Sequence, residues 1–440
     1  MIMRKFFGLI VLSALVFACK NDADETPSTR TIFKMNIASD ADLDNKQAWV
    51  IVRNSETGAL IDYQEVSAGA TLTFTDTIHA GSTSTEKIDV AYFTFESQSG
   101  SDPGKTNRLF NTLVYPGIAV GTEWSAKKVG YDQIPPAKAG DYNLYVSNLP
   151  DYYATSMTDN SGEELQNDQS GDRYNGPMTV HTDFTRQLLM VDPEGDKPKY
   201  LYVDNVAPST TRVFDYSSFK NFDKYVTFEA PEEIAMSVVV NGFTSSPLSP
   251  DGTYYRQGGF QLYSNICWAE GFDDFGFLLN RKKVEIGFLD EFSLYSVYVS
   301  GGNFSYNSIG SVPTSITYVD PSQFTVTNTT LSGFSFNASR DYVRRATWFY
   351  YNDPFTETTR NYIKTEYLSG NEPAKLYQPI PGALIAQFSI PIEKMRYGNS
   401  SFYVEGASQS EYLSRDKNAA TGYSLVPKPP FLEVFVVPKN

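Results

Sequence analysis

Apolar and polar residues alternate along much of this chain, the pattern typical of β-strands that bury one face. The clearest case is the segment 283–288, in which Val284, Ile286 and Phe288 are separated by polar residues or glycine. Because successive side chains of a strand point to opposite faces, the three apolar residues are expected on one side. Helical periodicity is scarce throughout the chain, so the sequence predicts a protein built from strands.

Similar strand-like runs recur at short intervals, separated by turn-forming segments such as 54–58 and 99–104. This spacing is typical of antiparallel β-sandwiches. The predicted strands are 32–37, 48–52, 60–63, 71–74, 88–95, 109–115, 142–146, 188–191, 200–203, 225–228, 236–240, 283–288, 295–299, 324–326, 334–336, 346–351, 385–390, 402–404 and 432–437.

The expected fold class is all-β, with two or three antiparallel β-sandwich (immunoglobulin-like) domains in tandem. The 440 residues exceed one ordinary sandwich, and Val52–Gly58 resembles the opening hairpin of bacterial immunoglobulin-like modules. Adjacent prolines within 134–140 predict a linker. We therefore expect β-rich domains at 31–130, 138–300 and 301–440. The polar segment 155–175 predicts a surface loop, and such loops often carry function.

The first apolar run is different, because it does not alternate. Arg4 and Lys5 precede the largely apolar run 6–17, which is shorter than the roughly 20 residues that span a bilayer and matches a secretory signal. The segment 15–19 resembles the lipobox of bacterial lipoproteins, in which a cysteine thiol receives a diacylglycerol. This resemblance implies a signal peptide at 1–18 and a membrane anchor on Cys19. The alternatives are a buried helix or a cleaved secretory signal with an incidental cysteine.

Polar and acidic residues follow this cysteine, so 19–30 is expected to be an acidic, flexible tether. It resembles the tethers of surface lipoproteins from the Bacteroidota, in which acidic residues after the cysteine favour transfer to the outer leaflet. The resemblance implies a lipid-anchored protein of the outer membrane that faces the cell exterior. A merely solvated linker is the alternative.

The charge of the chain bears on its possible partners, and its cysteine count bears on how the fold is stabilised. The formal charge is −15, which argues against nucleic acid, because binding it requires clustered Lys and Arg to replace counterions. The chain has only two cysteines. If Cys19 is lipidated, Cys267 has no partner within the chain, and the fold does not depend on a disulfide.

Catalytic patterns are weak, and we expect no enzyme. The two histidines, His79 and His181, are over 100 positions apart, which disfavours nucleophile triads and zinc sites. Adjacent carboxylates occur, for example Asp290 and Glu291, but neighbours on a strand point to opposite faces. A glycosidase needs two carboxylates across one bond.

A metal site is one interpretation of Asp40, Asp42 and Asp44, which offer oxygen ligands at alternate positions. An EF-hand would need glycine at Asn45 and glutamate at Ile51, and neither is present. A calcium site of another type and a solvated acidic turn both stay open. No other cofactor is expected.

Aromatic clusters provide the candidate ligand site. The candidate residues are Tyr254, Tyr255, Trp268 and Trp348, each within a short aromatic run. Sugar rings have apolar faces that stack on such side chains, but aromatic residues also fill sandwich cores. Packing is therefore the alternative at every one of these positions.

Together these features predict a membrane-anchored, surface-displayed, non-catalytic binding protein for a glycan or a cell-surface partner. In outline it resembles the accessory lipoproteins that sit beside nutrient transporters in Bacteroidota. The alternative is a structural or adhesive spacer lipoprotein with no small-molecule ligand.

Overall fold

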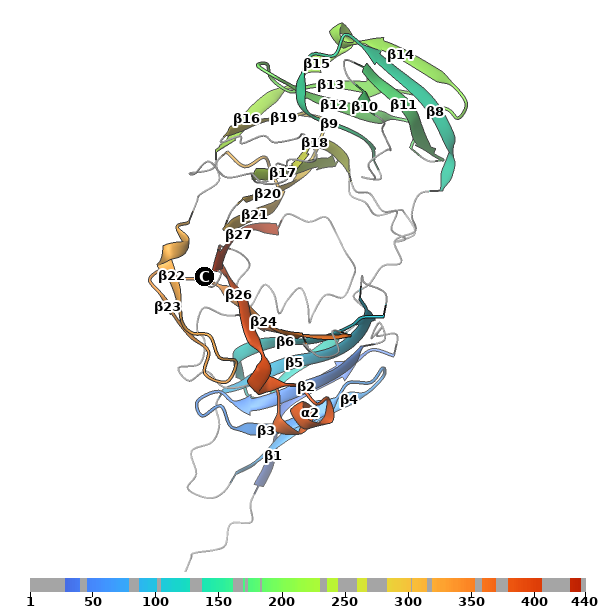
Figure 1. The fold of residues 1–440 in the computed structure, drawn as a ribbon. Helices are drawn as coiled ribbons and strands as arrows, with labels where there is room; N and C mark the ends of the chain where they lie inside the picture. Colours follow the sequence, from blue (N-terminus) through green and yellow to red (C-terminus); the bar gives the residue numbers. More distant parts are fainter. Residues whose placement is uncertain are drawn as a thin grey trace, which may run out of the picture.

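The chain folds almost entirely into β-strands, as Figure 1 shows for the computed structural model. The structure describes residues 28–39, 46–78, 87–100, 104–126, 137–160, 169–170, 173–182, 184–229, 236–243, 259–266, 283–301, 303–314, 319–352, 358–368, 379–405 and 428–436.

A 12-stranded sheet runs through the length of the molecule and curves along its course (Figure 1). Neighbouring strands are antiparallel except β25 and β6, which are parallel. In spatial order the strands are β18 (Phe260–Ile266), β17 (Met236–Phe243), β20 (Leu294–Gly301), β21 (Phe304–Gly310), β27 (Lys428–Val436), β26 (Arg396–Glu405), β24 (Arg344–Asn352), β25 (Thr359–Tyr367), β6 (Thr106–Ala119), β5 (Lys87–Ser99), β2 (Gln47–Asn54) and β3 (Leu60–Glu65).

At one end, a three-stranded sheet packs on β2, β5 and β6 to form a sandwich. Its order is β4 (Thr71–Ile78), β1 (Ser28–Ile37) and β7 (Thr122–Ala126). Alternation in β1 explains the packing, since Phe33, Met35 and Ile37 are buried while Lys34 and Asn36 bond to Glu123 on the other face. Each fully buried apolar side chain of this kind contributes roughly 1.5–3 kcal/mol.

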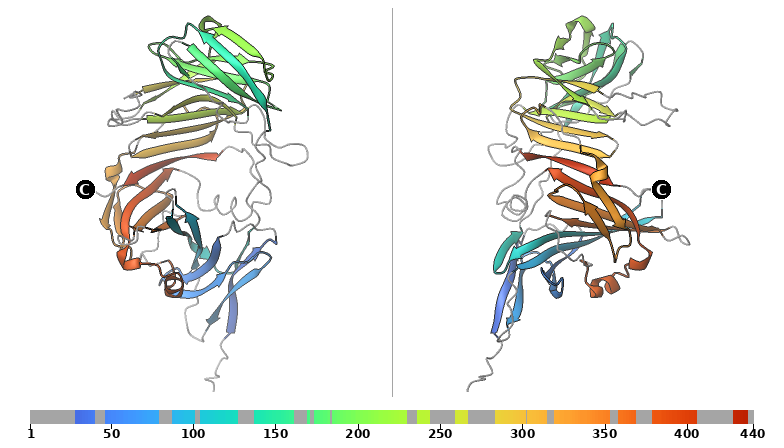
Figure 2. Two further views of the ribbon diagram at one scale, coloured as in Figure 1. Left: turned by 45° about the vertical axis from the view of Figure 1, so that its right-hand side comes forward. Right: turned by 90° about the vertical axis from the view of Figure 1, so that its left-hand side faces the viewer.

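At the other end, residues 138–221 form a second sandwich of two four-stranded sheets (Figure 2). Its core contains Tyr142, Leu144, Met157 and Leu189. One sheet is β10 (Gln169–Ser170), β11 (Arg173–His181), β8 (Lys138–Ser147) and β14 (Thr211–Asp215), and the other is β15 (Lys220–Asn221), β13 (Lys199–Val203), β12 (Gln187–Pro193) and β9 (Tyr152–Asp159).

This second sandwich is joined to the long sheet through β18. The Tyr263 hydroxyl donates to the Asp192 carboxylate at 2.7 Å, and the backbone N–H of Gln261 donates to the Thr158 hydroxyl at 2.8 Å. The expected loop at 155–175 was wrong in part, because Thr155–Asp159 belongs to β9 and the Asp159 side chain is buried. Thr158 and Asp159 are tolerated in this strand because Thr158 accepts from the Gln261 backbone and Asp159 pairs with His181 of β11.

Shorter elements cover the rest of the long sheet. The pair β16 (Lys224–Glu229) and β19 (Lys283–Phe288) buries Val284, Ile286 and Phe288, as the alternation predicted. Other parts of the sheet carry the hairpin of β22 (Phe324–Asn328) and β23 (Ser335–Ala338), the helix α2 (Gly382–Gln387), and the 3-10 turns η3 (Pro321–Gln323) and η4 (Ile392–Lys394). The 3-10 turn η1 (Tyr216–Ser218) belongs to the second sandwich, where Tyr216 packs against the core.

The predicted strand at 385–390 was wrong. Residues 385–387 belong to α2, which begins after Pro381 and buries Leu384. Ser389 then adopts a left-handed backbone with φ of 48°, which no strand accommodates. A short apolar run fits a helix turn as well as a strand, so periodicity could not distinguish the two.

The prediction of an all-β chain built on antiparallel sheets is confirmed. The immunoglobulin-like character and the division at 31–130, 138–300 and 301–440 stay predictions. Strands from all three ranges are hydrogen-bonded into the 12-stranded sheet, and the expected boundary at residue 300 falls inside β20. Pairing between distant strands leaves no mark on local periodicity, which is why the sequence did not reveal this continuity.

We expect Gly287→Ala to lower the free energy of unfolding by about 1–3 kcal/mol, because an added Cβ would overlap the ring of Phe222. Chemical denaturation should show an earlier midpoint. Gly310→Ala is the matched control, since no described atom lies within 4 Å of a Cβ at that strand position. Equal midpoints for the two variants would contradict close packing at Gly287.

Candidate functional site

Most of the residues proposed from the sequence lie outside the described part of the chain. These are the anchor Cys19, the aromatic residues Tyr254, Tyr255 and Trp268, and the acidic residues Asp40, Asp42 and Asp44. Among the described residues, no group of three or more His, Cys, Asp or Glu side chains could hold a metal ion. Of the proposed ligand-binding residues, Trp348 is therefore the one whose surroundings can be described.

Trp348 lies in β24, half-buried, on the face of the sheet opposite to the hairpin β22–β23. Its cross-strand neighbours are Lys364 of β25 and Asn399 of β26. The Lys364 ammonium lies 5.2 Å from the centre of the indole ring, and Glu366 holds that ammonium at 2.9 Å. The indole ring is therefore held between strands, with a cation over one part of its surface.

The aromatic run that contains Trp348 divides between the two faces of β24. Phe349 is buried in the core beside Phe334 and Tyr397. Tyr350 points the other way and keeps 39% of its surface exposed. The run was expected to be either core or ligand site. The two-residue period of the strand places Phe349 in the core and leaves Tyr350 exposed, so the ligand site stays a prediction.

Tyr350 lies in a strip of aromatic side chains, which we define as Trp348, Tyr350 and Tyr362. Tyr362 is the cross-strand partner of Tyr350. Directly opposed side chains in an antiparallel pair have Cβ atoms about 4.5–5.5 Å apart, and residues two apart on a strand lie about 7 Å apart. The aromatic strip thus spans roughly the length of one or two sugar rings.

A cavity of about 430 Å³ opens beside this strip and has Tyr350 in its wall. We call it the outer cavity. The loop between β22 and β23 forms one side, and the segment from η4 into β26 forms the other. Its lining residues are Thr329, Thr330, Leu331, Ser332, Tyr350, Ile392, Glu393, Met395, Arg396 and Tyr397.

The loop owes its shape to Asn328, whose side-chain oxygen accepts hydrogen bonds from the backbone and hydroxyl of Thr330, both at 2.9 Å. The Gly333 amide then donates to the Thr330 carbonyl at 3.3 Å. Such bonds from asparagine to the following backbone are a turn-forming device. The turn presents Thr329 and Ser332, which are both exposed, toward the outer cavity.

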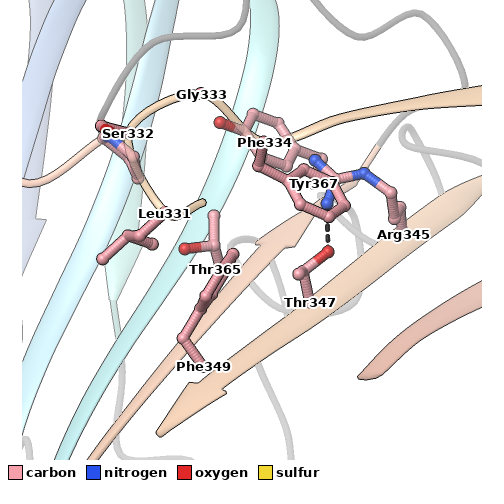
Figure 3. Close-up of a pocket in the computed structure, with 10 residues that line it drawn as sticks. Leu331, Ser332, Gly333, Phe334, Arg345, Thr347, Phe349, Thr365 and Tyr367 are labelled. Atoms are coloured by element: carbon pink, nitrogen blue, oxygen red, sulfur yellow. Dashed lines mark hydrogen bonds between the residues drawn. The ribbon is translucent and has the colours of Figure 1, made fainter. Parts of the chain in front are cut away.

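A second cavity, of about 140 Å³, shares Leu331 and Ser332 with the outer one and extends toward the core (Figure 3). We call it the inner cavity. Arg345 lines it and is only 2% exposed. Its guanidinium lies 4.9–5.0 Å from the ring centres of Phe334, Phe336 and Tyr367 and donates to the Thr347 hydroxyl. Arg345 therefore rigidly supports the base of the hairpin.

Tyr397 forms the boundary between the outer cavity and the core. Its hydroxyl donates to the Val436 carbonyl at 2.9 Å. Burial raises the pKa of Tyr397, outweighing the opposing effects of the Ser400 hydrogen bond and Arg345. The phenol is therefore neutral at physiological pH, and it ties β26 to β27 beneath the cavity.

The lining is suited to binding a polar ligand that also has apolar surface. Hydroxyls of threonine and serine can donate and accept, and Tyr350 offers an exposed ring. Among the described lining residues, Glu393 bears the single carboxylate, whereas glycoside hydrolysis ordinarily uses two.

Sequence reasoning named the run 348–351 but missed Arg345, Arg396 and the loop 329–333. The loop had a usable signal, since Asn328 to Gly333 is a continuous turn-forming stretch. Arg345 and Arg396 had none, because each owes its surroundings to strands and loops distant in the sequence.

Comparison with known protein families and with curated proteins finds no match to this chain.

We expect Arg345→Met to destabilise the fold by roughly 3 kcal/mol. Methionine cannot replace the contacts of the buried guanidinium with three aromatic rings or its charged hydrogen bond to Thr347. The measurement is the denaturation midpoint. Arg396→Met serves as control, because Arg396 is exposed and should change stability by no more than about 0.5 kcal/mol. A midpoint unchanged in Arg345→Met would refute the supporting role of this residue.

Proposed function

We propose that this protein is lipid-anchored at the outer membrane, is displayed on the cell surface, and binds a glycan without acting on it. The single observation that carries the binding part is Tyr350, an exposed aromatic side chain that belongs both to the aromatic strip and to the wall of the outer cavity. A sugar ring presents an apolar face of C–H groups and a rim of hydroxyls, and this site offers a surface for each.

The geometry of the strip supports this class of ligand. Trp348 extends the aromatic surface along β24 and Tyr362 extends it across to β25, while Thr329 and Ser332 line the outer cavity with Tyr350. Both aromatic side chains are half-buried and held by the sheet, so little side-chain freedom is lost on binding. A preorganised surface of this kind favours recognition of a rigid ring.

The anchoring part rests on Cys19 and on the tether that follows it. Within the described residues, no helix has the length and apolar character that crossing a bilayer requires. A diacylated cysteine would supply membrane attachment, because each buried methylene contributes about 0.8 kcal/mol and two chains hold a protein stably.

One observation favours the alternative function, a structural or adhesive spacer. Val213 is 71% exposed on the edge strand β14, and its cross-strand partner Tyr145 is 40% exposed. An exposed apolar pair on an edge strand is a feature of surfaces that contact other proteins. A protein contact at this end does not require a ligand at the outer cavity.

We expect Tyr350→Ala to weaken glycan binding at least tenfold, about 1.4 kcal/mol, because the stacking surface is lost. A printed array of defined polysaccharides identifies retained glycans, and titration calorimetry then measures their Kd. Tyr298→Ala is the matched control, since Tyr298 is 37% exposed on β20 and lines neither described cavity. An array blank for the unaltered protein, together with cell-aggregation defects in a deletion strain, would favour the spacer function instead.

We expect Cys19→Ser to move the protein out of the membrane fraction, because serine provides no thiol for the lipid. Fractionation followed by mass spectrometry of the N-terminal peptide tests this. The unaltered chain should yield an acylated cysteine at its mature N-terminus. An unmodified thiol on a freely soluble exported product would exclude the anchor.

A further inference from the structure

The charge around the outer cavity differs from that of the chain as a whole. The protein carries a formal charge of −15, yet two of its basic side chains, Arg396 and Lys394, are exposed on the segment that lines or flanks this cavity. Lys394 lies 5.5 Å from the ring centre of Tyr351, so it already has a contact. The side chain of Arg396 has no such contact with a described residue.

The side chain of Arg396 makes no hydrogen bond or ion pair with any described residue. Other arginines on the same sheet have clear partners. Arg344 binds Glu366 at 2.5 Å, and Arg108 donates to Asn361 at 3.1 Å. Arg396 is exposed, lines the outer cavity, and is the cross-strand partner of Tyr350. The two side chains therefore leave the same face of the sheet from neighbouring strands, and the donors of the guanidinium are available to a ligand.

A guanidinium is well suited to an anionic group. Its planar fork donates two parallel hydrogen bonds to a carboxylate or sulfate, and these charge-assisted bonds are about twice as strong as neutral ones. Its position next to Tyr350 allows a single sugar ring to stack on the phenol while a charged substituent of that ring meets Arg396. A neutral ring would leave this cation without a matching charge.

Glu393 sets the orientation of such a ligand. It is exposed in the same cavity and forms no ion pair with Arg396 within the described structure. A carboxylate accepts hydrogen bonds from sugar hydroxyls and repels an anion. The acidic substituent is thus directed toward Arg396 and the hydroxyl rim toward Glu393.

The overall negative charge does not prevent this. Exposed charges are screened beyond about 8 Å at physiological ionic strength, whereas a direct guanidinium contact at hydrogen-bond distance is not. Net charge reduces the rate at which a long polyanion approaches, more than it reduces the strength of a local bidentate contact.

We propose that the outer cavity selects a saccharide unit with an anionic substituent, a carboxylate or a sulfate, which Arg396 binds while the ring lies on Tyr350. This inference rests on the proposed glycan binding and specifies its ligand class.

The experiment compares matched probes that differ only in charge. One pair is trigalacturonic acid and its methyl ester, and the other is a sulfated galactan tetrasaccharide and its desulfated form. The array is printed with further acidic glycans and their neutralised partners. Calorimetry of the full chain gives the Kd for every retained probe at low and physiological salt.

The unaltered protein should bind the acidic member of at least one pair ten or more times more tightly than its neutral partner. Arg396→Gln should abolish that difference and leave the neutral probe unchanged, and Arg396→Lys should restore it in part. Tyr350→Ala should weaken both members. Arg340→Gln, in the turn before β24 and away from both described cavities, should change neither.

The remaining outcomes separate this inference from the proposed function. Retention of neutral glycans alone, or equal binding of acidic and neutral partners that Arg396→Gln does not alter, would overturn the inference and leave glycan binding intact. An array without any retained glycan would overturn both. Preference for the carboxylate pair or the sulfate pair identifies which anion the site takes.

Discussion

The parallel pairing of β25 with β6 is the interaction on which the rest of the structure depends. It joins 359–367 to 106–114, so strands 253 residues apart in the sequence, as in the pair Thr359 and Thr106, become neighbours in one sheet. On the buried face Ile363 meets Phe110, and Arg108 donates both to Asn361 and to the Phe388 carbonyl. Parallel strands need long connections, and here the connection is most of the chain. The entropic cost of closing a loop grows only slowly with its length, so this long connection costs little more than a shorter one.

That junction also positions the candidate site. β24 and β25 carry the aromatic strip, and β6 supports β25 from the other side. The core face of these strands is covered by the hairpin β22–β23 and by α2, and the outer cavity lies where that cover ends beside Tyr350. A site at the margin of a rigid sheet combines fixed side chains with access to solvent, which suits the binding that we propose.

Two arginines illustrate how burial determines the role of a side chain. Arg345 is enclosed by three aromatic rings and serves the packing of the hairpin. Arg396 is exposed beside a tyrosine, where a guanidinium can meet a ligand. The same chemical group is enclosed in one place and open to solvent in the other, and only its surroundings differ.

The sequence by itself determined where nearly all the predicted strands lie, because the alternation of apolar and polar residues is a local property that burial of one face imposes. It also supplied the candidate anchor at Cys19 and the aromatic run at 348–351. It failed at 385–390, where a short apolar run after Pro381 formed α2. Tertiary structure alone decided that Phe349 faces the core while Tyr350 stays exposed on the other face, and that Arg396 is its cross-strand partner. The pairings of β25 with β6 and of β21 with β27 join residues more than 100 positions apart, and no pattern within a single strand encodes its partner.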